Sequence, residues 1–176
     1  MQGMIDLIIS LQPIIDPALT LVAIVATIMG VLMVGGAMVK AYTISLGRGD
    51  ATISGVIWSM IIGGVLASSM SMVRIFGNTL FDGDVSGGAL LYQAAGMTQA
   101  QQSAMTAIMA LFTLTGYIAF VRGWVILNKH FNGVIKDGVG LGLTHIIGGT
   151  ILVYLDVFLS MLQNTTGINV GQMFGG

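Results

Sequence analysis

The chain has 176 residues, of which 55% are hydrophobic and only 7% are charged, with a formal net charge of −1. About a quarter of the residues of a soluble domain are charged, so this composition excludes a water-soluble globular protein, and the net charge excludes a broadly basic nucleic-acid-binding surface. Cysteine is absent, which excludes disulfides and thiolate metal sites.

The first segment, 1–16, is too short to cross a bilayer. Its apolar residues recur at helical spacing, at Met4, Ile5, Ile8 and Ile9. This pattern predicts a short helix lying in the membrane interface, and Pro13 is expected to end it. No Lys or Arg precedes its apolar residues, so the segment does not resemble a signal peptide.

Four apolar runs follow, each long enough to cross a hydrocarbon core, which takes about 20 residues. They lie at Ala18–Val39, Thr52–Val73, Ala104–Leu127 and Val139–Leu162. The predicted fold is therefore an all-α integral membrane protein with four helices in two antiparallel hairpins. Its parts are an interfacial N-terminal segment (1–16), a first hairpin (17–75), an external connection (76–103), a second hairpin (104–163) and a Gly-rich C-terminal tail (164–176).

The two short loops inside the hairpins carry most of the cations. Lys40 and Arg48 lie in the first loop, and Lys129 and Lys136 lie in the second. Short loops rich in Lys and Arg stay on the cytoplasmic side of a membrane. We therefore expect both loops inside, with both termini and the 76–103 connection outside.

The two hairpins resemble each other, which predicts duplication of a two-helix unit. Each first helix contains an internal glycine, Gly30 or Gly116, and each second helix contains Ile-Ile-Gly-Gly. These two four-residue motifs lie at Ile61–Gly64 and Ile146–Gly149.

Small residues recur at every fourth position of the second run, a pattern that lets two membrane helices approach closely. The ridge could pack against a helix of the same chain, or it could form contacts between subunits. Its members are Gly55, Ser59, Gly63, Ala67 and Ser71, and Gly140, Thr144, Gly148 and the adjacent Gly149 extend the pattern to the fourth run.

Ionisable residues inside membrane spans are unfavourable and need a structural or functional reason. Arg122 either extends its guanidinium to the interface or has a functional role, and His145 is expected to pack through a hydrogen bond. Asp156 and Arg74 are expected to form an ion pair near the outer end. We expect no metal site, no cofactor and no enzymatic activity, because no ligand cluster or nucleophile–base pair is present. Phe81-Asp82-Gly83-Asp84 reads as a turn.

A family resemblance rests on the last third of the chain. It is carried by Gly142-Leu143-Thr144-His145-Ile146-Ile147-Gly148-Gly149, Leu152, Asp156 and Gln163-Asn164-Thr165-Thr166-Gly167. This stretch is similar to the TraQ proteins of IncI-type conjugative plasmids and to the related IcmC/DotE and IcmD/DotP proteins of type IVB secretion systems. The hairpins resemble a duplicated VirB-type pilin.

The resemblance implies a subunit of a conjugative secretion apparatus in the bacterial inner membrane, and a pilin implies an extracellular pilus. Its partners would be copies of itself, phospholipid, other secretion-system proteins and transient single-stranded DNA or protein cargo. Lys40, Arg48, Lys129 and Lys136 would then face the lumen; the alternative is that they only set the topology. VirB-type pilins are shorter and are made with a long leader that this sequence lacks. An inner-membrane scaffold, an ion channel or transporter, and a holin-like protein remain open.

Overall fold

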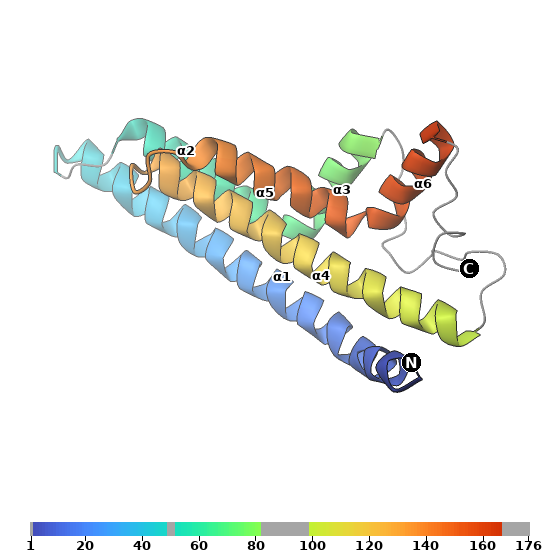
Figure 1. Cartoon of the computed structure of the whole chain (residues 1–176). Helices are drawn as coiled ribbons and strands as arrows, with labels where there is room; N and C mark the ends of the chain where they lie inside the picture. The colour runs from blue at the N-terminus through green and yellow to red at the C-terminus, as the bar shows by residue number, and fades with distance from the viewer. Residues whose placement is uncertain (1, 49–51, 82–98, 167–176) are drawn as a thin grey trace.

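The computed structural model describes residues 2–48, 52–81 and 99–166 (Figure 1). Every element in these ranges is an α-helix, as the sequence predicts. Most of the predicted external connection, Asp50, Asp82, Asp84 and the residues after Thr166 lie outside the described ranges. The helices are α1 (Gln2–Ser45), α2 (Ile53–Ala67), α3 (Ser69–Phe81), α4 (Gln99–Phe131), α5 (Gly138–Val153) and α6 (Leu155–Thr166).

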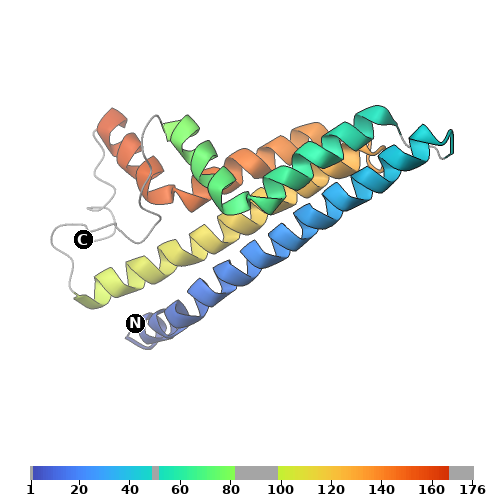
Figure 2. The same cartoon turned by 180° about the vertical axis from the view of Figure 1, so that it is seen from behind.

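Two helices are long and apolar enough to cross a membrane, over Pro13–Ser45 of α1 and Met105–Phe131 of α4. The number of spans rises to four if each of the two bent helix pairs, α2–α3 and α5–α6, counts as one span. Figures 1 and 2 show α1, α2, α4 and α5 running along one bundle, with α3 and α6 projecting from it on the same side. The structure is thus that of an all-α membrane protein.

The predicted break after residue 16 is absent. Helix α1 continues from Gln2 to Ser45 with Pro13 and Pro17 inside it, so a separate interfacial helix over 1–16 is wrong. Proline removes one backbone donor and crowds the preceding turn, which kinks a helix without always ending it. In Figure 1 the first turns of α1 are tilted away from the rest of the helix.

The second and fourth predicted spans are not continuous helices. A bend of 92° separates α2 from α3, and a bend of 82° separates α5 from α6. At about 1.5 Å per residue, α2 and α5 are each about 22–24 Å long, which is shorter than a hydrocarbon core of about 30 Å. The predicted spans over Thr52–Val73 and Val139–Leu162 are therefore each a pair of helices joined at a bend.

The first bend is held by hydrogen bonds that composition does not reveal. The Ser68 hydroxyl donates to Gly64 O at 2.8 Å, and the Ser68 N–H donates to the same carbonyl at 3.2 Å. Such hydroxyl bonds to the preceding turn favour helix bending. The next residue, Ser69, is buried and hydrogen-bonded to the Tyr117 hydroxyl of α4. Gly77 of α3 then lies against the Tyr154 ring at the second bend.

The core lies around α4, whose Phe120 is fully buried. Ile62 and Leu66 of α2 and Ile146 of α5 belong to the same buried cluster. Phe76 of α3 adds edge-to-face contacts to the rings of Phe120 and Trp124. Helix α3, which follows the first bend, therefore contributes a side chain to the core of the protein.

The structure strengthens the duplication and corrects its alignment. Gly30 and Gly116 each lie against a glycine of the following helix, and they are 86 positions apart. The same separation aligns Gly63 with Gly149, whereas the Ile-Ile-Gly-Gly motifs would align it with Gly148. It also aligns the positive-φ glycines Gly47 (φ 66°) and Gly133 (φ 73°) and the bend residues Ser68 and Tyr154. Each unit therefore consists of a long helix and two shorter helices that are separated by a sharp bend.

Candidate functional site

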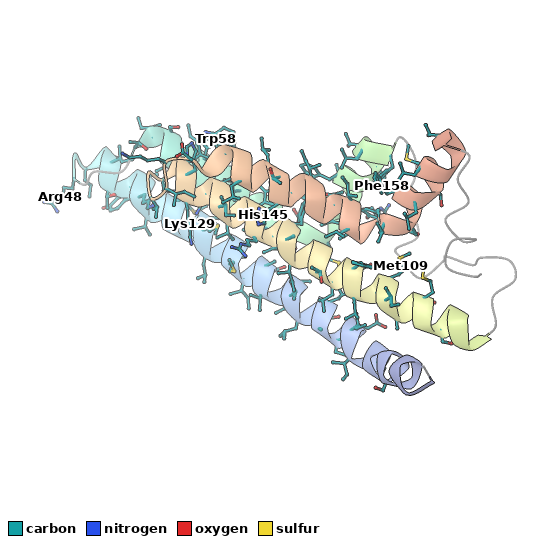
Figure 3. The ribbon with its side chains drawn as sticks, in the orientation of Figure 1. Arg48, Trp58, Met109, Lys129, His145 and Phe158 are labelled. Carbon is teal, nitrogen blue, oxygen red and sulfur yellow. The ribbon has the colours of Figure 1, made fainter. Side chains whose placement is uncertain are left out.

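The basic residues lie at one end of the bundle. In Figure 1 the C-terminal end of α1 and the α4–α5 connection lie toward the same end of the bundle, and Figure 3 shows Arg48 and Lys129 toward this end. All four predicted cations, Lys40, Arg48, Lys129 and Lys136, are exposed. The fold thus brings together residues that are up to 96 positions apart in the chain.

A polar network beneath this end joins three helices. The Ser59 hydroxyl of α2 donates to Asn128 Oδ1 at 2.8 Å, and Asn132 Nδ2 donates to Ser59 Oγ at 2.8 Å. Lys40 Nζ of α1 donates to Asn132 Oδ1 at 2.8 Å. The network therefore links the two repeats. Sequence analysis missed Asn128 and Asn132, although two amides spaced by four residues at the end of an apolar run are a recognisable signal.

The ridge of small residues on α2 is used mainly inside the chain. A Cβ on Gly63 would lie 2.7 Å from Gly30 O, and a Cβ on Gly55 would lie 3.1 Å from Phe131 O. Ser59 is buried in the polar network. These three residues let α1 and α4 approach α2 closely, so packing within the chain accounts for them.

The remaining members of the ridge lie elsewhere. Ala67 is half-buried beside Gly30, and its carbonyl accepts a hydrogen bond from Thr27. Ser71 lies beyond the bend and is exposed. The two adjacent glycines of α5 differ: Gly149 packs against Gly116, whereas Gly148 has no atom within 4 Å of a built Cβ.

The structure does not form the predicted ion pair between Arg74 and Asp156. Arg74 is exposed on α3, and Oδ1 of Asp156 is buried with no hydrogen-bond partner. Among the described residues, Asp156 Oδ1 is therefore a buried acceptor without a partner, which is rare in native structures.

Arg122 lines an apolar groove of about 410 Å³ between α1 and α4. Val25 and Met29 form part of one wall, and Val121 and Val125 form part of the other. His145 lies on α5, where its Nδ1 is 2.8 Å from Leu141 O. The two residues therefore do not share a site, and the groove presents one cation among hydrocarbon side chains.

Among the described residues there is no group of three His, Asp or Glu side chains that could hold a metal ion. No family model, curated protein or solved structure matches the chain. The described residues offer a basic end and an apolar groove that contains Arg122.

Proposed function

We propose that the protein is a non-enzymatic structural subunit of a conjugative type IVB secretion apparatus, and that it is the pilin that assembles with phospholipid into a conjugative pilus. The family resemblance is the reason for proposing a secretion apparatus. The small residues exposed on the outer surface of α5 are the reason for proposing that copies of the subunit assemble.

The observation that carries assembly is a ridge of small residues on α5 whose two glycines contact nothing in the described part of the chain. Gly140, Thr144 and Gly148 lie one turn apart, and a Cβ on either glycine would meet no atom within 4 Å. In a membrane, exposed small residues at this spacing are typical of helix–helix contacts. The small residues Gly55, Ser59 and Gly63 of α2 already pack within the chain, whereas the α5 ridge can contact another subunit.

The basic end and the groove fit the same role. Lys40, Arg48, Lys129 and Lys136 are exposed on segments at the same end of the bundle and would attract a polyanionic cargo such as single-stranded DNA by screened, sequence-independent interactions. An acyl chain in the groove beside Arg122 would place hydrocarbon against hydrocarbon and a lipid phosphate near the guanidinium. These features support a pilus in which the basic end faces the lumen and the groove holds a phospholipid.

Gly148→Leu is expected to disrupt assembly without unfolding the subunit, because leucine extends into open space on the ridge. Size-exclusion chromatography in mild detergent should show high-order oligomers for the native chain and at least tenfold less of them for Gly148→Leu. Donor cells carrying only the variant should show a matching loss of transfer. Gly64→Leu is the control, since it adds the same side chain into open space on α2. A native chain that stays monomeric and lipid-free would contradict the proposal.

A pilin differs from an inner-membrane scaffold of the same machine in where it is found. A cysteine at position 86, in a chain with no native cysteine, can be labelled with a membrane-impermeant maleimide. Label on shed extracellular filaments identifies a pilin. Label confined to the cell envelope would instead identify a scaffold or channel component.

A small ion channel or transporter is the second candidate, favoured by the buried, unpartnered Asp156 Oδ1 at a helix bend. Broken helices place charged groups inside membrane transporters. Under this alternative, purified protein in vesicles should conduct ions, and Asp156→Asn should reduce the flux at least tenfold. Vesicles that remain impermeable with the native chain would rule this candidate out.

A further inference from the structure

Within the chain, the second repeat packs onto the first through one face of α4. Its stripe consists of Tyr117, Val121, Trp124 and Asn128, spaced by four, three and four residues. Tyr117 and Val121 are only 3% and 9% exposed. Asn128 bonds Ser59 of α2 at 2.8 Å, and Trp124 contacts Phe76 of α3. Helix α4 thus lies against both α1 and the α2–α3 pair.

The equivalent stripe on α1 is not covered by any of the residues that the structure describes. The residues 86 positions earlier are Val31, Gly35, Met38 and Tyr42, and all four are exposed. Val31 and Tyr42 are 59% and 66% exposed, against 3% for Tyr117. A face that is buried in the second repeat is therefore open in the first.

The surface of α2 against which the α4 stripe packs also has an equivalent in the second repeat, on α5. On α2, the residues Gly55, Ser59 and Ile62 are buried. Their equivalents on α5 are Leu141, His145 and Gly148. Leu141 is 51% exposed, and Gly148 meets nothing within 4 Å. The surface that α4 covers in the first repeat is thus more exposed in the second, where His145 and Gly148 are half-buried and Leu141 is exposed. Figure 3 shows His145 on α5.

We propose that α1 of one copy packs against α4 and α5 of the next copy, as α4 packs against α1 and α2 within the chain. This inference rests on the proposed function as an assembly subunit, and it names the two surfaces that meet. Because the surfaces are different and both belong to every copy, the contact is head-to-tail and propagates into a ring or a filament. The second copy continues an interface that the chain already forms with itself.

The side chains on the two open surfaces are complementary. Gly35 and Gly148 replace the larger Val121 and Ile62, so two copies can approach more closely than the repeats do. Tyr42 takes the place of Asn128 and His145 takes the place of Ser59. His145 Nδ1 is engaged by the Leu141 carbonyl at 2.8 Å, which leaves Nε2 as an acceptor for a tyrosine hydroxyl. The Ser59–Asn128 hydrogen bond within the chain would become a His145–Tyr42 hydrogen bond between copies.

Cysteine cross-linking tests this contact directly, because the native chain has no cysteine. Membranes containing Tyr42→Cys/His145→Cys are oxidised with copper phenanthroline and examined on non-reducing gels. We expect a ladder of dimers, trimers and larger species. Each single variant alone should give no ladder, and a mixture of the two single variants should stop at dimers. Thr43→Cys/His145→Cys is the matched control, because the equivalent of Thr43 is the exposed Lys129; it should give at least tenfold less dimer.

Two outcomes would overturn the inference while leaving the proposed function standing. One is a high-order oligomer in which the 42–145 pair does not cross-link, with lipid or another protein on these surfaces. The other is a dimer formed by Tyr42→Cys alone, since this requires a symmetric contact. A chain that forms no oligomer at all would overturn both proposals together.

Discussion

Gly149→Leu is expected to lower the free energy of unfolding by on the order of 3 kcal/mol, whereas Gly148→Leu one residue earlier should change it by less than about 0.5 kcal/mol. The same side chain is added to the same helix in both variants. Only its direction differs, because successive residues of a helix point to different sides.

The large effect follows from backbone contact. A Cβ on Gly149 would lie 2.6 Å from Gly116 O and 2.6 Å from Phe120 N. Neither atom can move without shifting α4, so the two helices must separate and lose packing along their length. Gly148 has no such neighbour. The crossing at Gly116 and Gly149 therefore requires glycine for close approach.

Unfolding of purified protein in mixed micelles by increasing sodium dodecyl sulfate, followed by fluorescence of Trp58 and Trp124, measures this difference. Gly63→Leu is a second test, since a Cβ there would lie 2.7 Å from Gly30 O. If Gly149→Leu unfolded at the same detergent fraction as Gly148→Leu, the close crossing of α4 and α5 would be wrong.

Asn132→Ala is expected to lower the free energy of unfolding by about 2–3 kcal/mol, because alanine cannot replace the hydrogen bonds that the Asn132 side chain makes to α2 and α4. Asn132 Nδ2 donates to Ser59 Oγ, to Asn128 O and to Asn128 Oδ1. Its Oδ1 also accepts from Lys40. The variant would thus weaken the contact between the two repeats at the basic end.

Lys40→Ala separates the contribution of the cation from that of the network. Lys40 is exposed, so its loss should lower the free energy of unfolding by less than about 1 kcal/mol. The double variant Ser59→Ala/Asn132→Ala should destabilise less than the sum of the single variants, since both act on one network. Equal effects of Lys40→Ala and Asn132→Ala, or strict additivity, would contradict this account.

The membrane character and the helical class follow from composition and the apolar runs. The position of each basic loop between two adjacent apolar runs likewise predicts that Lys40, Arg48, Lys129 and Lys136 lie at one end. Figure 3 shows Arg48 and Lys129 toward the same end. The glycines at positions 30 and 116 indicate a duplicated unit, because each lies at a similar place in the first helix of its hairpin.

The bends were not predictable in this way. Neither Ser68 nor Tyr154 is a proline or glycine, and apolar residues continue on both sides of each bend. The first bend is secured by Ser69 and Tyr117, which are 48 positions apart. Likewise, the absence of an Arg74–Asp156 pair depends on the directions of α3 and α6 after the bends, which hydropathy does not encode.

The sequence by itself thus determined that this protein is helical, lies in a membrane, contains two related units and carries its cations in two short loops. These properties depend on residue type and on spacing within about 20 residues, which local physics translates into helices and topology. Only the tertiary structure decided which small residues are covered. Gly148 and Gly149 are identical and adjacent, yet one packs on Gly116 and the other is open, because the rotation of α5 against α4 is set by contacts distant in the chain.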